Sequence, residues 1–301
     1  MIIDTHVHYN LEPLYSGQES DQANKMSTKS TQIWRRHWEK AQQNGVSHSI
    51  VIGTNVMTSV TATQIAGSEK NIFASVGIHP SECVQNYYDA LASNVALFDT
   101  LFDDIDLDVS QIEHLANEKK VVAIGEVGLD YYRLPKDLRA QKIIVELQKH
   151  AFERQLSLAK KHHLPVVIHV RDQEVIIEPK PGNAYWDALS ILQSHNVQQF
   201  TLHCVSGPIV YVQAAIEMGG YMGFDGNLTY KNAQAIRDIF AIVPEHRRLV
   251  ETDAPYLPPQ EFRGKVCEPW MISKTVEYIE KELKFDPARL IENSKKLFQF
   301  D

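Results

Sequence analysis

Short apolar runs alternate with longer amphipathic segments along the whole chain. Eight such runs begin near Ile2, Ser49, Ile72, Val121, Pro165, Gln199, Tyr221 and Arg248. The run from Val121 to Ile124 has no polar alternation, as expected for a parallel strand covered on both faces. The segments between the runs have helical periodicity, so strands and helices are expected to alternate.

The clearest helical segment extends from Leu138 to Lys161. Its apolar or uncharged positions recur at helical spacing, at Ile144, Leu147, Ala151, Gln155 and Leu158. Asp137 precedes the segment as an N-cap. Eight strand-helix units predict an α/β fold of the (β/α)8 TIM-barrel type, formed as a single domain over residues 1–301.

An open doubly wound sheet is the alternative fold. A glycine-rich fingerprint would be expected after its first strand, but the sequence there is His6-Val7-His8. Three inserts interrupt the barrel pattern: Leu11 to Ser30, Asp99 to Ser110, and Gln173 to Asn183. Each is expected to be a surface loop.

Polar side chains end several of the predicted strands. The set comprises His6, His8, Glu126, His169, His203 and Asp253. All six are expected at the C-terminal rim of the barrel, where enzymes of this architecture keep their active sites. A single histidine at a strand end is more often structural, but six such residues together indicate metal binding.

Glu126 lies between Gly125 and Gly128 with no Lys or Arg within five residues. A buried carboxylate without a cationic partner is costly, and metal coordination is one remedy; capping of the next helix is the alternative. Imidazole and carboxylate together suit Zn, Mn, Fe, Co or Ni, with Mg kept as a further candidate. Six ligands exceed one tetrahedral site, so two divalent ions are expected, with Glu126 as the bridge.

Composition restricts the possible partners. The net charge is −8 and the sequence pI is about 5.9, which does not suit a protein that coats duplex DNA. The three cysteines form no C-x-x-C pair, which favours a reducing compartment. No leader peptide or membrane-spanning run is evident, so a soluble cytoplasmic protein is expected, without a membrane or an obligate protein partner.

Several motifs together resemble the TatD family of metal-dependent deoxyribonucleases, within the amidohydrolase-like superfamily. They are Asp4-Thr5-His6-Val7-His8, Gly77-Ile78-His79-Pro80, Gly125-Glu126-Val127-Gly128-Leu129-Asp130, Ile168-His169-Val170-Arg171-Asp172, His203-Cys204-Val205-Ser206-Gly207 and Glu251-Thr252-Asp253-Ala254-Pro255. The resemblance extends from Ile2 to the segment ending at Phe298. It implies a barrel hydrolase that cleaves phosphodiester bonds in DNA, with digestion from the 3′ end. The net charge of −8 and a site at the mouth of a barrel favour the end of a single strand over the interior of a duplex.

The resemblance also implies roles for the strand-end residues. One ion would be held by His6, His8, Glu126 and Asp253, and the other by Glu126, His169 and His203. Water between two cations is acidified towards neutral pH, and Asp253 would orient it and take its proton as general base. Glu126 and Asp253 are therefore the predicted catalytic residues.

Substrate contacts are expected from Arg171, His79, Arg133 and Arg263. Arg171 lies two residues beyond a predicted ligand, where a guanidinium can grip a phosphate, although pairing with an acid is the alternative. His79 follows the third strand and could equally be structural. Exposed bases could stack on Tyr131, Tyr132 or Tyr256, although aromatic residues beside a barrel strand are more often core.

The sequence departs from the family pattern at two positions, where Asn10 replaces a common Asp and Cys267 a common Asn. These departures leave the predicted metal ligands unchanged and bear on substrate preference. A small-molecule amidohydrolase or esterase with the same binuclear site is one alternative function. A metal-binding scaffold without catalysis is another, but the complete ligand set argues against it.

Overall fold

Eight parallel strands form one sheet whose order follows the chain from first to last. They are β1 (Ile2–Val7), β2 (Val46–Ile52), β3 (Ile72–Val76), β4 (Val121–Asp130), β5 (Val166–Arg171), β6 (Phe200–Leu202), β7 (Tyr221–Phe224) and β8 (Arg248–Val250). Val7 forms a bridge with Ala254, so the end of the sheet returns to its beginning. The computed structural model, which describes residues 1–301 apart from 17–29, 94–96, 174–176, 181 and 301, thus confirms the predicted (β/α)8 barrel.

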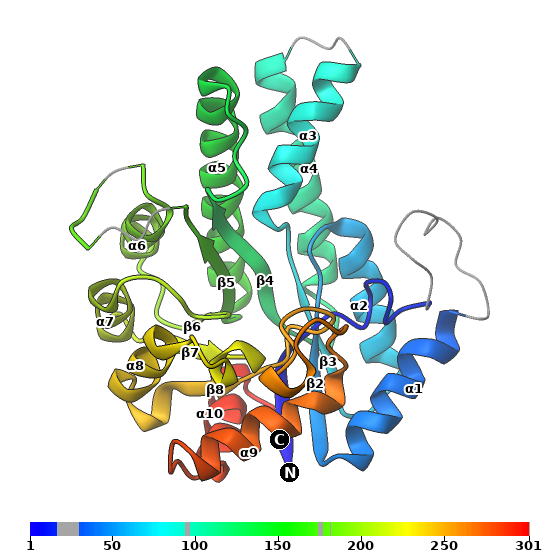
Figure 1. The fold of residues 1–301 in the computed structure, drawn as a ribbon. Coiled ribbons are helices and arrows are strands. Elements are labelled where there is room, and N and C mark those ends of the chain that lie inside the picture. Colours follow the sequence, from blue (N-terminus) through cyan, green and yellow to red (C-terminus); the bar gives the residue numbers. More distant parts are fainter. Residues whose placement is uncertain (17–29, 94–96, 174–176, 181, 301) are drawn as a thin grey trace.

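Helices surround the strands (Figure 1). The α-helices are α1 (Ser30–Gln43), α2 (Val56–Ser68), α3 (Pro80–Ala92), α4 (Leu97–Leu115), α5 (Leu138–His162), α6 (Ala184–Ser194), α7 (Ile209–Glu217), α8 (Gln234–Ile242), α9 (Ile272–Lys281) and α10 (Ala288–Phe298). Short 3₁₀ turns are η1 (Gly226–Thr229), η2 (Glu245–Arg247), η3 (Gln260–Phe262) and η4 (Pro269–Met271). In the described parts of the chain, none of the helices combines the length and apolarity needed to cross a bilayer.

The α5 helix confirms the prediction for this segment and fixes two strand ends. Asp137 caps it by accepting a hydrogen bond from the amide of Ala140. Two buried glutamines on its inner face bind the backbone of the barrel: Gln148 pairs with the amide and carbonyl of Asp130, and Gln155 with those of Ile78. These bonds satisfy backbone groups at the C-terminal ends of β3 and β4.

The prediction of a surface loop from Asp99 to Ser110 is wrong, because this insert lies within α4. The acidic residues concealed an apolar stripe at helical spacing, formed by the buried side chains of Leu101, Ile105, Val109 and Ile112. The α4 helix lies beside α3 and α5, and in Figure 1 the three extend upward beyond the strands. The insert is therefore part of a packed helical layer.

The other two inserts are described only in part. Of the first, residues 17–29 lie outside the described residues, Leu14 is buried, and Ser30 begins α1. Of the third, residues 177–180 are irregular and exposed, as expected for a surface loop, and Asn183 caps α6. Residues 174–176 and 181 lie outside the described residues.

Candidate metal centre

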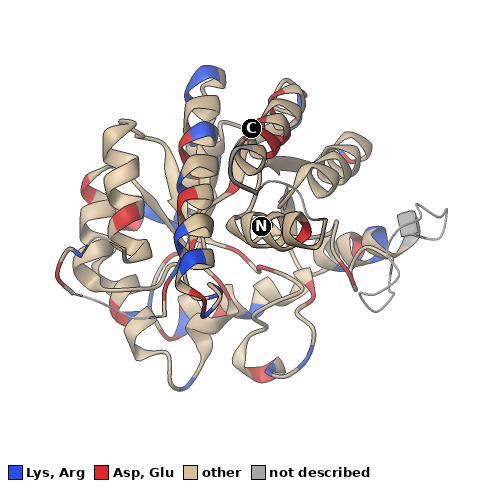
Figure 2. Ribbon diagram, turned by 90° about the horizontal axis from the view of Figure 1, so that it is seen from above, with Lys and Arg blue, Asp and Glu red and all other residues tan. Residues whose placement is uncertain are grey.

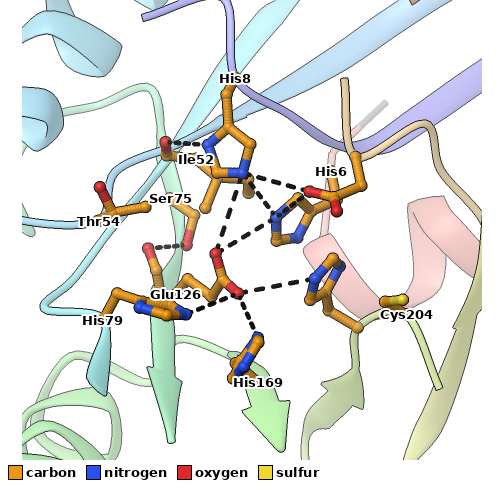
Figure 3. A network of polar contacts seen from close by, with 12 residues as sticks. His6, His8, Ile52, Thr54, Ser75, His79, Glu126, His169 and Cys204 are labelled. Carbon is orange, nitrogen blue, oxygen red and sulfur yellow. Dashed lines mark hydrogen bonds and ion pairs between the residues drawn. The ribbon is translucent and has the colours of Figure 1, made fainter. Parts of the chain in front are cut away.

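Glu126 lies at the centre of a cluster of imidazoles near the C-terminal ends of the strands (Figure 3). The prediction that Glu126 ends its strand is wrong, because β4 continues to Asp130. Its carboxylate is buried, with only 4% of the residue exposed. One oxygen, Oε2, lies 3.5 Å from Nε2 of His6 and 4.0 Å from Nε2 of His8. This side of the carboxylate therefore faces the pair of histidines that end β1.

The other oxygen of Glu126 faces a different set of imidazoles. Oε1 lies 3.0 Å from Nδ1 of His169, 3.6 Å from Nε2 of His203 and 3.5 Å from Nε2 of His79. His169 lies within β5, two residues before its end, whereas His203 and His79 follow β6 and β3. One carboxylate thus contacts two separate groups of nitrogen donors, which is the arrangement expected of a bridging ligand.

Glycines allow β4 to approach β5 closely enough to build this cluster. Gly128 has φ of +135°, and a Cβ there would lie 2.0 Å from the carbonyl oxygen of His169. Gly125 has φ of +154°, and a Cβ there would lie 2.6 Å from the carbonyl oxygen of Val167. Larger residues at either position would displace the backbone on which Glu126 stands.

Asp253 lies opposite Glu126, beside the two histidines of β1. Its Oδ1 is 3.4 Å from Nε2 of His8 and 3.7 Å from Nε2 of His6. The amide of Asp253 donates to the carbonyl of His6 over 2.9 Å, which ties this residue to the strand that carries both histidines. The six residues predicted as metal ligands therefore converge, and we call them the donor ring: His6, His8, Glu126, His169, His203 and Asp253.

The donor ring fits divalent cations. Three groups have ligand atoms within 4.8 Å of one another: His6, His8 and Glu126; His6, His203 and Asp253; and His79, Glu126 and His169. The Nε2 atoms of His6 and His8 are 3.2 Å apart in a buried site. Imidazole nitrogens and carboxylate oxygens this close together form a donor set that a divalent cation can bind.

The grouping differs in one respect from the ligand sets implied by the family resemblance. His203 stacks on His6 with a 3.6 Å centroid distance, and its donor nitrogen groups with those of His6 and Asp253. His79, predicted as a substrate contact, occupies the position beside Glu126 and His169. Its Nδ1 also accepts a hydrogen bond from the amide of Ser81 and so caps α3, which is the structural interpretation of this residue. A contact between His79 and substrate stays a prediction.

Electrostatics keep the central carboxylate ionised. Burial alone would raise the pKa of Glu126, but His79, His203, His169 and His6 outweigh it and hold this pKa well below its usual range. Burial lowers the pKa of His79 to about 3, and it also lowers the pKa of His6. Both imidazoles are therefore neutral near pH 7. A neutral His6 has one ring nitrogen with a lone pair for a cation. In His79, Nδ1 already accepts from Ser81, so Nε2 carries the proton towards Glu126 and a cation there would displace it.

His203 and His169 behave differently. Burial would lower the pKa of His203, but the carboxylates of Glu251, Asp253 and Glu126 outweigh it and raise the pKa to about 10. The pKa of His169 is also raised, because hydrogen bonds to Asp130 and Glu126 outweigh burial. Without a cation His203 is therefore protonated near pH 7, so cation binding would displace a proton from it.

Two carboxylates behind these rings were not predicted as functional residues. Glu251 Oε1 lies 2.9 Å from Nδ1 of His203, and Asp130 Oδ2 lies 3.5 Å from Nε2 of His169. A signal was present in the sequence, because Glu251 lies two positions before Asp253, and Asp130 four positions after Glu126. His8 is held in a similar way, with Nδ1 3.1 Å from the carbonyl of Ile52.

The predicted arginines lie in more exposed positions, and we call Arg133, Arg171 and Arg263 the rim cations. Arg171 stacks its guanidinium over the ring of Tyr132, 3.9 Å from the centroid. The Arg133 side chain is 59% exposed, with Nε 3.7 Å from Oδ2 of Asp130. Arg263 stacks over Tyr230 at 4.7 Å. Of the three, Arg133 and Arg171 are close in sequence to donor-ring motifs.

The three candidate tyrosines separate into core and surface. Tyr131 is buried and donates a hydrogen bond to Asp187 over 3.0 Å, so it belongs to the core. Tyr132 is 49% exposed and Tyr256 is 53% exposed. The Tyr256 ring lies 6.2 Å from that of His8, at the edge of the donor ring.

The two departures from the family pattern are buried and have structural contacts. Asn10 donates from Nδ2 to the carbonyls of Ile52 and Thr58, each over 2.9 Å. The carbonyl of Ile52 is also the partner of His8 Nδ1. Cys267 is 1% exposed and packs in the core. Asn10 thus supports a donor-ring histidine from behind.

Comparisons with known proteins agree with these observations. The chain matches the family described as TatD related DNase over residues 3–299. It is 30% identical over 309 residues to the uncharacterized metal-dependent hydrolase YabD of Bacillus subtilis strain 168, which covers 100% of both chains. It is 27% identical over 242 residues to the uncharacterized metal-dependent hydrolase TatD of Mycobacterium tuberculosis, which covers 79% of each chain.

Solved structures show the same fold. The structure of YjjV, a TatD homolog from Escherichia coli K12, superposes with a TM-score of 0.74 and 23% identity, and the match covers 100% of this chain and 98% of that chain. A TatD-family hydrolase from Entamoeba histolytica gives a TM-score of 0.69 at 17% identity, covering 99% of this chain and 97% of that chain.

Proposed function

Because the chain belongs to the TatD related DNase family and is a metal-dependent hydrolase of that family, we propose that it cleaves phosphodiester bonds in DNA. The substrate we propose is the end of a single strand, digested from the 3′ side. The observation that carries the proposal is the position of Glu126, whose two oxygens face different groups of histidines. Such a site suits two cations that share one carboxylate.

Two bound divalent ions would supply an acidified water and positive charge for the phosphate that is attacked. The residues of the chain hold and orient the reacting groups. Glu126 and the imidazoles face a common point from strands β1, β4, β5 and β6. Their fixed positions avoid reorganisation during the reaction, which is the main advantage of a site built on strand ends.

Asp253 is the proposed general base. Burial would raise its pKa, but His203, His8 and His6 outweigh burial and lower the pKa below its usual value. The carboxylate is therefore ionised near neutral pH and can accept a proton. Only 8% of the residue is exposed, so few bulk waters compete for that carboxylate.

The preference for a strand end rests on charge. The net charge is −8, and in Figure 2 Lys and Arg are scattered among Asp and Glu over the helices. Few phosphates along a duplex can be neutralised by such a surface. Arg171 on Tyr132, together with exposed Tyr256 beside His8, supplies a guanidinium and an aromatic face for one or two nucleotides.

The test is a nuclease assay on metal-stripped protein to which Mg, Mn, Co or Zn is added back. Matched linear and covalently closed single strands serve as substrates, with Glu126→Ala as the inactive control. We expect metal-dependent trimming of the linear strand and little cleavage of circles. Equal cleavage of circles would replace the exonuclease proposal with an endonuclease. No cleavage of either, with turnover in a parallel panel of amides and esters, would refute the DNase proposal.

A further inference from the structure

The His203 ring lies between two carboxylates that have different surroundings. Its Nε2 faces Oε1 of Glu126 at 3.6 Å, while its Nδ1 lies 2.9 Å from Oε1 of Glu251. Glu126 belongs to the donor ring, whereas Glu251 lies on the far side of the imidazole. The two ring nitrogens of His203 therefore face two different carboxylates.

Glu251 is held rigidly although it contacts no other donor-ring side chain among the described residues. Only 1% of the residue is exposed, and its one ion pair in the described chain is with His203. Its Oε1 also accepts the amide of Cys204 over 2.7 Å, and its Oε2 accepts the hydroxyl of Thr5 over 3.3 Å. A buried carboxylate is costly to desolvate, so these bonds are needed to keep it there.

Gly223 makes room for this carboxylate. A Cβ at Gly223 would lie 2.4 Å from Oε2 of Glu251 and 2.6 Å from both Cδ and Oε1. Gly223 belongs to β7, and its strand neighbour is Leu249 on β8. The space for the Glu251 side chain is therefore set by a residue outside the motif that contains Glu251 itself.

A hydrogen bond at Nδ1 determines what the other nitrogen of the ring can do. With its proton on Nδ1 directed at Glu251, a neutral His203 presents the lone pair of Nε2 towards Glu126. The ring also stacks on His6 at 3.6 Å with an angle of 18°, so a rotation of His203 would disturb a second donor. The orientation of His203 therefore affects both parts of the donor ring.

We propose that Glu251 is a positioning residue that fixes the tautomer and orientation of His203 for cation binding, with Gly223 providing its space. This proposal rests on the metal centre of the proposed function, but it does not depend on DNA being the substrate. It assigns Glu251 a role through His203, without contact with substrate. Carboxylates behind metal-binding histidines typically change metal affinity by about 10- to 100-fold.

The experiment measures metal affinity and the His203 tautomer in isosteric variants. Glu251→Gln keeps the size of the side chain but removes its charge, and Gly223→Ala pushes the unchanged Glu251 carboxylate away. Affinity for Zn is measured by competition with a chromophoric chelator. The Nδ1–H proton of His203 is observed by NMR in Zn-loaded, ¹⁵N-histidine-labelled protein and is assigned with His203→Asn.

Both variants should bind Zn about 10- to 100-fold more weakly than the wild type. In Glu251→Gln, the His203 Nδ1–H resonance should move upfield, because its acceptor has lost its charge. The matched control is Asn293→Ala, which removes a partly buried hydrogen bond to the carbonyl of Glu245 and a buried one to the carbonyl of Arg248. That control should lower Tm without changing Zn affinity, since it acts at the other end of β8.

Three outcomes are distinguishable. Wild-type affinity and an unshifted Nδ1–H resonance in Glu251→Gln would overturn the positioning role. Equal weakening of Zn binding in Asn293→Ala would also overturn it, because general destabilisation would then explain the loss. Failure of the wild-type protein to bind Zn, Mn, Co or Mg would instead refute the proposed function, whatever Glu251 does.

Discussion

The donor ring and the rim cations show two ways of holding polar side chains at the same end of a barrel. Each donor-ring histidine is buried or partly buried, and three of them contact a second protein group behind the ring, as His203 does with Glu251. Arg171 and Arg263 instead rest on single aromatic rings. The proposed metal ligands are therefore fixed by the strand ends, whereas the proposed substrate contacts are side chains that can move separately.

The largest expected effect comes from breaking the donor ring at its centre. Glu126→Ala removes the one carboxylate that faces both groups of imidazoles, so both cations should be lost. Hydrolysis should fall to the level of metal-stripped wild type. Elemental analysis after dialysis measures the loss, and Glu113→Ala, an exposed carboxylate paired with Lys161, is the control. Retention of two ions by Glu126→Ala would contradict the bridging role.

A second variant separates metal binding from proton transfer within the donor ring. Asp253→Asn keeps an oxygen towards His8 but cannot accept a proton as a carboxylate does. Its kcat should fall by about 10²- to 10⁴-fold. Metal content should stay close to that of the wild type, as measured by elemental analysis beside single-turnover kinetics. A kcat near the wild-type value at saturating metal would exclude Asp253 as general base.

The contrast between ring and rim also explains what could be predicted from sequence. A polar residue that follows a buried apolar run is a specific signal, because the topology of a barrel places it at the C-terminal rim. His169 after Val166 and Asp253 after Val250 were therefore identified, and the structure places His169 beside Glu126 and Asp253 beside His8. Their positions follow from local sequence and topology alone.

Contacts between distant elements could not be predicted in this way. The bond between Glu251 and His203 joins residues 48 positions apart, and its space depends on Gly223 of a third strand. The α4 helix was missed because its charge suggested a loop, while Ile105 and Val109 packed inward. The partners of Arg171 and Arg263 were also unpredictable, since stacking on Tyr132 or Tyr230 depends on side-chain orientation.

A smaller effect is expected at the rim. Arg171→Ala removes a guanidinium that can form a bidentate contact with one phosphate. Its loss should raise KM about 10-fold. The metals should remain, because Arg171 is no member of the donor ring. KM for a linear oligonucleotide and metal content are measured together, with Arg154→Ala as control because its guanidinium is bound to Asp106, between α4 and α5. An unchanged KM would remove Arg171 from the substrate contacts.

The smallest expected effect is in the salt dependence of binding, and it tests the rim as a whole. A protein that neutralises about two phosphates of a single strand should show a slope of log affinity against log salt near −1.4. Between about 50 and 200 mM salt its affinity would fall roughly sevenfold, far less than the roughly 10³- to 10⁵-fold expected for a protein that contacts many phosphates of a duplex. Arg171→Ala should flatten the slope by about 0.7, because one phosphate contact is lost. The measurement uses inactive Asp253→Asn protein and a fluorescent single strand, so that the substrate survives titration. A steep slope that Arg171→Ala leaves unchanged would show that binding depends on many cations outside the rim, and the argument for a strand end would then fail.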